Sequence, residues 1–276
     1  MRALGASRVL GRSGLMVKAL GFGCSYGAPA KAYEMAFERG CNYFYWGSFR
    51  SASMGDAIRN IAPRRRDELV VCIQSYARWG WYVRQSLHSA LRSLKLDHAD
   101  VLLLGWYNHM PSPGVMDAAV RLKDEGKVRA IAVSCHDRPL FETYIKDPRF
   151  DIIMVRYNAA HRGAEREVFP KLSTVAKAPG VITYTTTRWG HLVDAKRMPS
   201  GVKTPSGLDC YRYVLTDPHV DMCLSGPATV EEMQENLRVL DAEPMSEDEL
   251  RWMRTVGDHV HKNSQWEWNP FNERQQ

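Results

Sequence analysis

Short apolar runs alternate with helix-like segments along almost the whole chain. The runs are apolar nearly throughout, which is typical of strands that are buried on both faces of a sheet. The segments between them repeat apolar positions at helical spacing, and the clearest is the amphipathic stretch WYVRQSLHSALRSLKLD at 81–97. The pattern therefore predicts a parallel sheet that is covered by helices.

Eight strand–helix units follow one another in this way. The predicted strands are residues 17–23, 41–47, 68–75, 99–107, 128–136, 150–158, 180–187 and 220–226. The predicted helices are residues 30–40, 54–61, 81–97, 115–127, 138–147, 164–178, 206–218 and 229–241. Eight units in a chain of this length predict a closed (β/α)8 TIM barrel. An open doubly wound sheet is the alternative, but no glycine-rich dinucleotide fingerprint follows the first strand.

No linker or low-complexity segment interrupts the alternation, so a single domain is expected over residues 1–276. Its tail, residues 263–276, carries Trp266, Trp268 and Phe271 among polar residues. Aromatic side chains in a polar tail are expected to pack, either over the barrel mouth or against another subunit. Both alternatives stay open at this stage, and so does the oligomeric state.

The composition is that of an ordinary globular protein, with 45% hydrophobic and 25% charged residues. The six cysteines form no CxxC pair and have no zinc-ligand spacing, so they are expected to be reduced and mostly buried, as in a cytoplasmic protein. The N-terminal residues contain no apolar signal-peptide core, and no apolar run approaches the length of a membrane span.

The net charge of +6 and the pI of about 9 predict a mildly basic surface. The basic run PRRRDE at 63–68 ends in two acids. It is therefore more typical of a solvated loop than of the basic stripe that nucleic-acid binding needs. We expect a small-molecule ligand, with neither nucleic acid nor a membrane as partner.

Arginine and aromatic residues gather at the predicted carboxyl ends of the strands, where a TIM barrel places its functional residues. The predicted substrate-binding residues are Trp46, Arg50, Gln74, Tyr76, Trp106, Arg156 and Arg188. Such a mouth would suit an anionic, planar or aromatic ligand. Arg156 and Arg188 follow neighbouring strands and would share one anion, unless each pairs with a local acid.

Histidines also lie near these strand ends, at positions 109, 136, 161 and 191. Their spacing does not match a metal site, so no metal is expected. Cys135 and His136 are adjacent, but neighbouring strand residues point to opposite faces, which disfavours a nucleophile–base pair.

Four motifs, in order and at the right spacing, resemble the aldo-keto reductase superfamily. They are LGRSGLMVKALGFG at 10–23, EGKVRAIAVSCH at 125–136, VRYNAAHRGAEREVFP at 155–170 and SGPATVEEMQENL at 225–237. The similarity runs from about residue 8 to residue 258. The resemblance implies a barrel that is closed at its bottom by an N-terminal hairpin. It also implies binding of NADP(H) without a Rossmann fold and reduction of aldehydes and ketones.

The family's four catalytic positions are all replaced in this chain. Tyr45 stands at the aspartate position, Arg50 at the tyrosine, Gln74 at the lysine and Gly105 at the histidine. In the family the tyrosine protonates the developing alkoxide, and the lysine, held by the aspartate, lowers the pKa of that tyrosine. The replacements imply that NADPH-dependent carbonyl reduction does not survive in its usual form.

The resemblance assigns five residues to cofactor binding: Ser134, Tyr184, Thr185, Glu235 and Asn236. Ala228 replaces the arginine that grips the 2′-phosphate, and Glu232 replaces a glutamine. A carboxylate suits a ribose hydroxyl better than a phosphate. Met154 and Cys135 replace two contacts to the carboxamide. We therefore expect NADP or NAD to bind weakly, with little preference for NADP.

Two functions of different classes follow from the sequence. The first is a divergent small-molecule enzyme, nominally an oxidoreductase, whose candidate catalytic residues for proton transfer are Tyr45, Tyr107 and His136; non-redox chemistry on an anionic substrate is also compatible with it. The second is a non-catalytic binding or regulatory subunit that keeps the barrel as a scaffold. A deep, dry mouth with converging polar groups favours the enzyme, whereas a mouth filled by Trp46, Trp106 and tail residues favours the scaffold.

Overall fold

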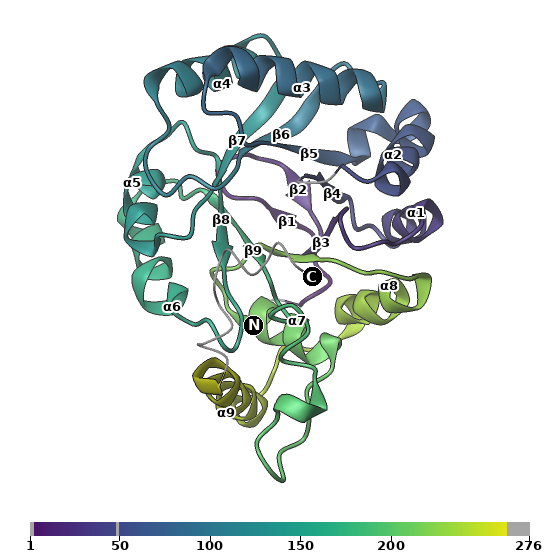
Figure 1. The fold of residues 1–276 in the computed structure, drawn as a ribbon, viewed down its shortest axis with the longest axis vertical. Coiled ribbons are helices and arrows are strands. Elements are labelled where there is room, and N and C mark those ends of the chain that lie inside the picture. The colour runs from purple at the N-terminus through teal and green to yellow at the C-terminus, as the bar shows by residue number, and fades with distance from the viewer. Residues whose placement is uncertain (1–2, 48–49, 264–276) are drawn as a thin grey trace.

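The computed structural model, which describes residues 3–47 and 50–263, is a closed barrel of eight parallel strands (Figure 1). Around the barrel the strands run in the order β10–β3–β4–β5–β6–β7–β8–β9. They are β3 (Leu20–Gly23), β4 (Tyr43–Trp46), β5 (Val70–Ser75), β6 (Ala99–Leu104), β7 (Val128–Ser134), β8 (Ile152–Arg156), β9 (Gly180–Tyr184) and β10 (Met222–Ser225). The prediction of a (β/α)8 TIM barrel is confirmed.

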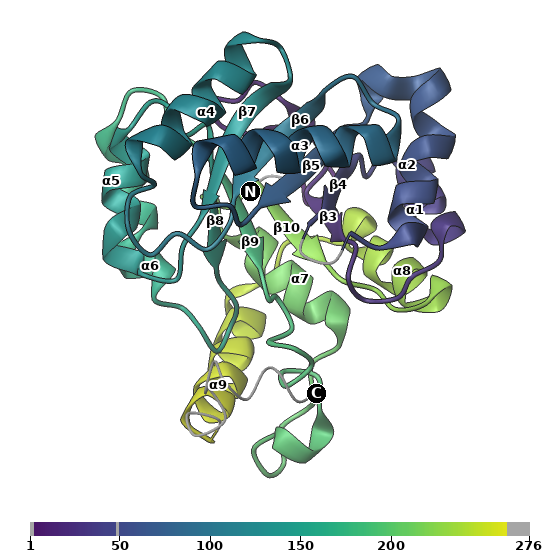
Figure 2. The same cartoon turned by 45° about the horizontal axis from the view of Figure 1, so that its top comes forward.

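Helices form an outer ring around the strands, as Figures 1 and 2 show from two directions. They are α1 (Ala30–Glu38), α2 (Ala52–Arg65), α3 (Gly80–Leu94), α4 (Pro113–Asp124), α5 (Phe141–Lys146), α6 (Ala164–Glu167), α7 (Gly207–Thr216), α8 (Val230–Leu237) and α9 (Glu247–Asn263). Short 3-10 helices lie at Arg66–Glu68, Arg138–Leu140, Phe169–Thr174, Ala195–Arg197 and Arg238–Asp241.

Three segments differ from the prediction. The basic run at 63–68, expected as a solvated loop, is the end of α2 followed by the 3-10 helix Arg66–Glu68. The helix predicted at 164–178 is only the short α6, followed by the 3-10 helix Phe169–Thr174. Pro170 has no backbone N–H, and its ring clashes with a carbonyl one turn earlier, which disfavours a continuous α-helix at this position. The helix α9 comes after the last strand–helix unit and was not predicted, although it buries Met253, Val256 and Val260.

Alternation within the strands divides the core into two layers. On β4, Tyr43 and Tyr45 belong to the cluster inside the barrel, whereas Phe44 and Trp46 belong to the cluster between strands and helices. This is the two-residue period of a strand, in which successive side chains point to opposite faces. It decides which strand-end residues can reach the mouth.

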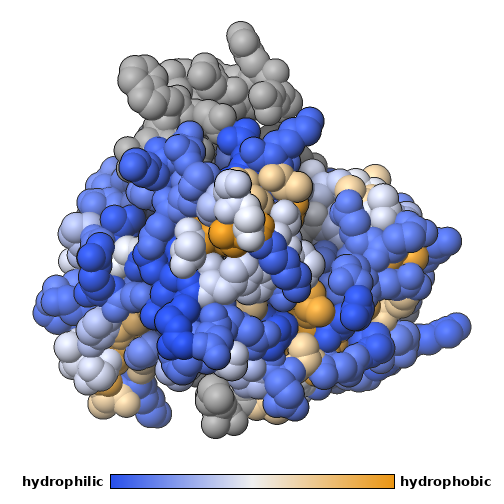
Figure 3. Space-filling view, turned by 90° about the horizontal axis from the view of Figure 1, so that it is seen from below, coloured by the Kyte–Doolittle hydropathy of each residue, from blue (hydrophilic) through white to orange (hydrophobic). Residues whose placement is uncertain are grey.

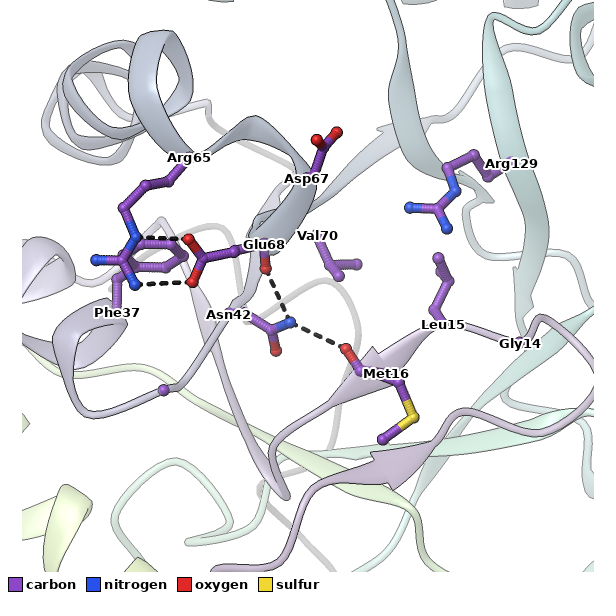
Figure 4. Close-up of a pocket in the computed structure, with 11 residues that line it drawn as sticks. Gly14, Leu15, Met16, Phe37, Asn42, Arg65, Asp67, Glu68, Val70 and Arg129 are labelled. Carbon is purple, nitrogen blue, oxygen red and sulfur yellow. Dashed lines mark hydrogen bonds and ion pairs between the residues drawn. The ribbon is translucent and has the colours of Figure 1, made fainter.

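The N-terminal hairpin closes the end of the barrel opposite the mouth. Its strands β1 (Arg8–Val9) and β2 (Met16–Val17) pair antiparallel, and Leu10 and Leu15 join the cluster inside the barrel. The amide of Asn42 ties the hairpin down, because it donates to the carbonyl oxygens of Met16 at 2.9 Å and Glu68 at 3.0 Å (Figure 4). The hairpin that the resemblance implied is therefore present.

On the face shown in Figure 3, hydrophobic residues form small separate patches in a largely hydrophilic surface. Among the helices of the described residues, none is both long and apolar enough to cross a membrane. The predicted packing of the aromatic tail concerns residues 264–276, which lie outside the described residues.

Two glycines allow a test of the helix packing. Gly257 in α9 lies against the backbone of the loop after β8, where a Cβ would sit 2.1 Å from the carbonyl oxygen of Ala159. We expect Gly257→Ala to lower the free energy of unfolding by about 1–3 kcal/mol, as overpacking does. Gly114 in α4 has no heavy atom within 4 Å of its Cβ position. The matched variant Gly114→Ala should leave stability unchanged or raise it by up to about 1 kcal/mol.

Urea unfolding followed by circular dichroism measures both variants. Equal midpoints for Gly257→Ala and Gly114→Ala would show that α9 does not press on the backbone of that loop.

Candidate functional site

A cavity of about 500 Å³ opens at the carboxyl ends of the strands, and all eight strands contribute to its lining. Nine residues that the sequence assigned to the site line it: Tyr45, Gln74, Tyr76, Trp106, Ser134, His136, Arg156, Tyr184 and Thr185. Its size falls in the range of small-molecule sites. The sequence reasoning missed Tyr26, Asn108 and Trp189, which also line the cavity. These three belong to loops, where no periodic pattern indicates the direction of a side chain.

Tyr45 and Gln74 form a neutral hydrogen-bonded pair on neighbouring strands, with the Tyr45 hydroxyl donating to the Gln74 Oε1. The Gln74 side chain is buried and lies against Gly105, where a Cβ would sit 2.0 Å from the Gln74 Nε2. A Cβ on Gly47 would likewise sit 2.1 Å from the Tyr45 ring. The two glycines therefore make room for the pair, and the replaced positions 45, 74 and 105 fit one another as a set.

Arg156 and His136 form a second pair at the ends of β8 and β7. The Arg156 Nη2 donates to the His136 Nδ1 at 3.0 Å. Burial of the ring and the neighbouring Arg156 charge lower the pKa of His136 to about 4. The imidazole is therefore neutral at pH 7. Because its Nδ1 accepts a hydrogen bond, its Nε2 carries the proton and can donate to a ligand.

Ser134 and Tyr184 lie in the same wall of the cavity. The Ser134 hydroxyl accepts a hydrogen bond from the backbone N–H of Trp106 at 2.9 Å. Burial raises the pKa of Tyr184 to about 12, against the opposite effect of Arg156. Tyr184 is therefore a neutral phenol at physiological pH, and it presents an aromatic ring to the cavity.

Two residues that the sequence placed at the mouth, Trp46 and Arg50, lie behind the barrel wall instead. Trp46 is buried under α2, and its indole Nε1 donates to the Ser51 carbonyl oxygen at 2.9 Å. The guanidinium of Arg50 lies 5.6 Å from the Trp46 ring centroid and donates to the Ser86 Oγ at 3.0 Å. Trp46 points outward because it follows Tyr45, which points inward.

Tyr107 is also buried outside the cavity, so it cannot be the proton donor. Its hydroxyl donates to the Ala77 carbonyl oxygen at 2.7 Å, and the Arg78 guanidinium stacks over its ring at 4.0 Å. Burial raises the pKa of Tyr107. Of the three predicted proton donors, the structure places only Tyr45 and His136 in the cavity.

Arg188 does not line the cavity, so Arg156 and Arg188 do not share an anion there. Arg188 is buried and its Nη1 donates to the His161 Nε2. Burial and the nearby Arg188 charge lower the pKa of His161 to about 3. His161 in turn meets the His261 ring of α9 edge to face. The backbone turns at Arg188 with φ 52°, which directs this arginine away from the mouth.

The residues around α8 provide a second part of the site. The Asn236 Nδ2 donates to the Ser225 Oγ at 2.9 Å, and Ser225 lines the cavity. Glu235 faces away and pairs with Arg238 at 2.8 Å. The Glu232 carboxylate accepts the backbone N–H of Ala228 at 2.7 Å, just before α8 begins.

All six cysteine thiols are buried, as predicted from the sequence. Within residues 3–47 and 50–263, no group of three or more His, Cys, Asp or Glu side chains is arranged to hold a metal ion.

Comparisons with known proteins agree with this architecture. The model of the Aldo/keto reductase family matches residues 27–209. An uncharacterized oxidoreductase of Bacillus subtilis, YqkF, is 25% identical over 90% of this chain and 95% of its own length. An aldo-keto reductase of Bacillus halodurans in its holo form superposes with a TM-score of 0.75 at 21% identity, over 91% of this chain and 95% of that one.

An aldo/keto reductase of Klebsiella pneumoniae in complex with NADP and acetate superposes with a TM-score of 0.71 at 19% identity, over 91% of this chain and 95% of that one. At such identities the two solved structures support the fold alone.

The two low histidine pKa values predict how stability depends on pH. Between about pH 6.5 and pH 4 the unfolded chain binds protons at His136 and His161 that the folded chain does not bind. This contribution to stability is full above pH 6.5 and is lost as the pH falls. We expect urea midpoints to fall from pH 7 to pH 4.5, and to fall less in the double variant His136→Gln, His161→Gln.

Histidine NMR titration gives the site-resolved check. Midpoints near 6.5 for His136 and His161 would contradict the description of both rings as neutral partners of arginine.

Proposed function

The chain belongs to the aldo/keto reductase family, and on that premise we propose that its barrel mouth binds a nicotinamide nucleotide together with a small planar ligand. We further propose that it binds NAD(H) in preference to NADP(H) and does not reduce simple aldehydes by the family's tyrosine mechanism. The observation that carries the proposal is the neutral Tyr45–Gln74 pair at strand ends where the resemblance places an aspartate and a lysine.

A neutral amide cannot replace the lysine in its electrostatic role. An ammonium group favours the ionised form of a nearby tyrosine and so makes that tyrosine a better proton donor. The Gln74 amide has no charge, and its Oε1 already accepts the Tyr45 proton. The histidine position is Gly105, and the contact with Gln74 leaves no room there for a side chain. Standard proton transfer to an alkoxide therefore lacks its donor in this site.

The residues of one half of the site fit a nicotinamide nucleotide. Ser134 and Tyr184 offer a hydroxyl and an aromatic ring in one wall of the cavity, and Thr185 and Ser225 line it beside them. Asn236 lies next to this lining, because its side-chain amide donates a hydrogen bond to Ser225. These groups would hold the nicotinamide and its adjoining phosphates, and the nucleotide, when bound, supplies or accepts a hydride.

The residues around α8 do not fit a 2′-phosphate. A phosphate there would meet the Glu232 carboxylate, which already accepts the Ala228 N–H. The arginine that the family uses for this phosphate is replaced by Ala228. A carboxylate pairs well with a ribose hydroxyl and repels a phosphate. The site is therefore suited to NAD(H).

Charge that develops on a reacting oxygen would be stabilised on the same side of the cavity, at the ends of β7 and β8. Arg156 supplies a permanent positive charge, and the His136 Nε2–H supplies a hydrogen-bond donor. Preorganised donors of this kind stabilise developing charge without moving. Tyr45 and His136 are the side chains through which a proton could be transferred within the cavity.

A non-catalytic binding or regulatory subunit is the second candidate function. It is favoured by the same hydrogen bond, because the Tyr45 proton is directed to Gln74 rather than toward the cavity. Both functions include nucleotide and ligand binding, and they differ in hydride transfer. Of the residues expected to fill the mouth of a scaffold, Trp46 lies under α2 and Trp106 borders the cavity, whereas the tail lies outside the described residues.

Nucleotide selectivity gives the test of the proposal. In fluorescence titrations we expect the unmodified protein to bind NADH more tightly than NADPH. Ala228→Arg should raise NADPH affinity roughly ten- to hundredfold, because a charge-assisted hydrogen bond contributes about 1.5–3 kcal/mol. Glu232→Gln should also improve NADPH binding, since it removes the repelling charge, while NADH binding weakens.

Glu243→Gln serves as the control, because this acid lies beyond α8 and does not accept the Ala228 N–H. Tight NADPH binding by the unmodified protein, unchanged in Glu232→Gln, would show that the phosphate is held elsewhere.

A further inference from the structure

Four neighbouring strand ends build one wall of the mouth cavity from aromatic and cationic side chains. This wall consists of Trp106 after β6, His136 after β7, Arg156 on β8, and Tyr184 and Trp189 on and after β9. The His136 ring meets Trp106 and Tyr184 edge to face, with centroid distances of 5.8 Å and 6.2 Å. The Arg156 guanidinium lies 5.4 Å from the Trp189 ring centroid. The five side chains thus form one contiguous surface.

The two tryptophans of this wall are held in an uncommon backbone conformation. Trp106 has φ 57° and Trp189 has φ 51°. Thr185, which also lines the cavity, has φ 60°. The left-handed region is unfavourable for bulky and β-branched residues, and such residues cluster at ligand sites. Yet 52% of Trp106 and 46% of Trp189 remain exposed. Their contacts with the described residues leave both rings partly open, so that a flat ligand could cover them.

Among the described residues that line the cavity, Arg156 is the charged side chain, and no Asp, Glu or Lys lies beside it. A ligand with a single negative charge would meet a cation and no acid among these residues. The planar guanidinium fork pairs best with a planar carboxylate, to which it can donate two parallel hydrogen bonds.

His136 adds a second donor next to that fork. Its Nδ1 accepts from Arg156, so the neutral ring is fixed in the tautomer that carries its proton on Nε2. Arg156 and His136 would therefore both donate to one acceptor group.

The described residues on the opposite side and the floor of the cavity carry no charge. Tyr45 and Gln74 are paired with each other, and Leu103, Met154 and Leu224 supply apolar lining. A ligand that reaches from the wall to this floor must be uncharged beyond its anionic group. Flat aromatic surfaces at the wall favour a ligand that is itself flat.

We propose that this wall is a subsite for an aromatic or conjugated carboxylic acid, with the carboxylate on Arg156 and His136 and the planar body against Trp106 and Trp189. The inference rests on the proposed function in one respect, since it names the planar ligand that would share the mouth with the nucleotide. The carboxylate binding itself needs no nucleotide.

Three fluorinated probes test the subsite in the full chain without nucleotide, by fluorine NMR titration. They are 4-fluorobenzoate, the uncharged 4-fluorobenzamide of the same shape, and trifluoroacetate, which has the carboxylate but no ring. We expect 4-fluorobenzoate to bind at least tenfold more tightly than either of the others. Equal affinity for the acid and the amide would overturn the proposal, and so would equal affinity for benzoate and trifluoroacetate.

Variants assign the binding to this wall. Arg156→Gln should remove the preference for the acid over the amide, and Arg156→Lys should restore part of it by keeping the charge without the fork. Trp106→Ala should weaken both aromatic probes at least threefold. The control Arg84→Gln, which breaks an exposed ion pair with Glu125 on the outer helices, should change nothing.

Benzoate binding that is unchanged in a folded Arg156→Gln protein would overturn the proposal. The NADH titration is independent of these probes. Its failure together with normal benzoate binding would remove the nucleotide from the proposed function and leave the carboxylate subsite in place.

Discussion

The mouth of this barrel depends on the position of one amide group, that of Gln74. It is buried between the Tyr45 hydroxyl and the Cα of Gly105, and a Cβ at position 105 would sit 2.0 Å from its Nε2. A buried amide needs a hydrogen-bond partner, and Tyr45 provides it. A family residue placed at one of the positions 45, 74 or 105 alone would therefore clash with its neighbours or remove the hydrogen bond between Tyr45 and Gln74. The three positions have changed as a set, and the result is a cavity floor without charge.

Because the described residues of the floor carry no charge, the positive charge of the site lies on the opposite wall. Arg156 is the charged side chain of the described lining, and burial together with the contact to Arg156 keeps the His136 imidazole neutral. In the family pattern an aspartate and a lysine would supply charges at the ends of β4 and β5. Here a guanidinium at the end of β8 faces aromatic rings. The fold is that of a reductase, while the charge distribution is better suited to holding an anion than to protonating an alkoxide.

The alternation of apolar runs and helical segments was sufficient to predict the barrel, because buried parallel strands and their covering helices have distinct periods. The replacement of the catalytic positions rests on the resemblance to the family and stays a prediction. The directions of the side chains beyond the strand ends could not be predicted. Trp106 and Arg188 have positive φ, and no residue pattern indicates that the chain turns there. The two-residue period of the strand, extended from Tyr45 to Trp46, would have predicted that the Trp46 side chain points outward. The bond between Glu232 and the Ala228 N–H depends on loop geometry at the start of α8.

The central claim is that the neutral Tyr45–Gln74 pair cannot act as the family's acid. Stopped-flow mixing measures this directly, with the protein in excess over NADH and an aromatic aldehyde added, while the absorbance of the reduced nicotinamide is followed for a single turnover. Our account predicts that the absorbance decays no faster than in a protein-free control. A burst that oxidises the bound nucleotide, and that is lost in Tyr45→Phe, would contradict the account and identify Tyr45 as the proton donor.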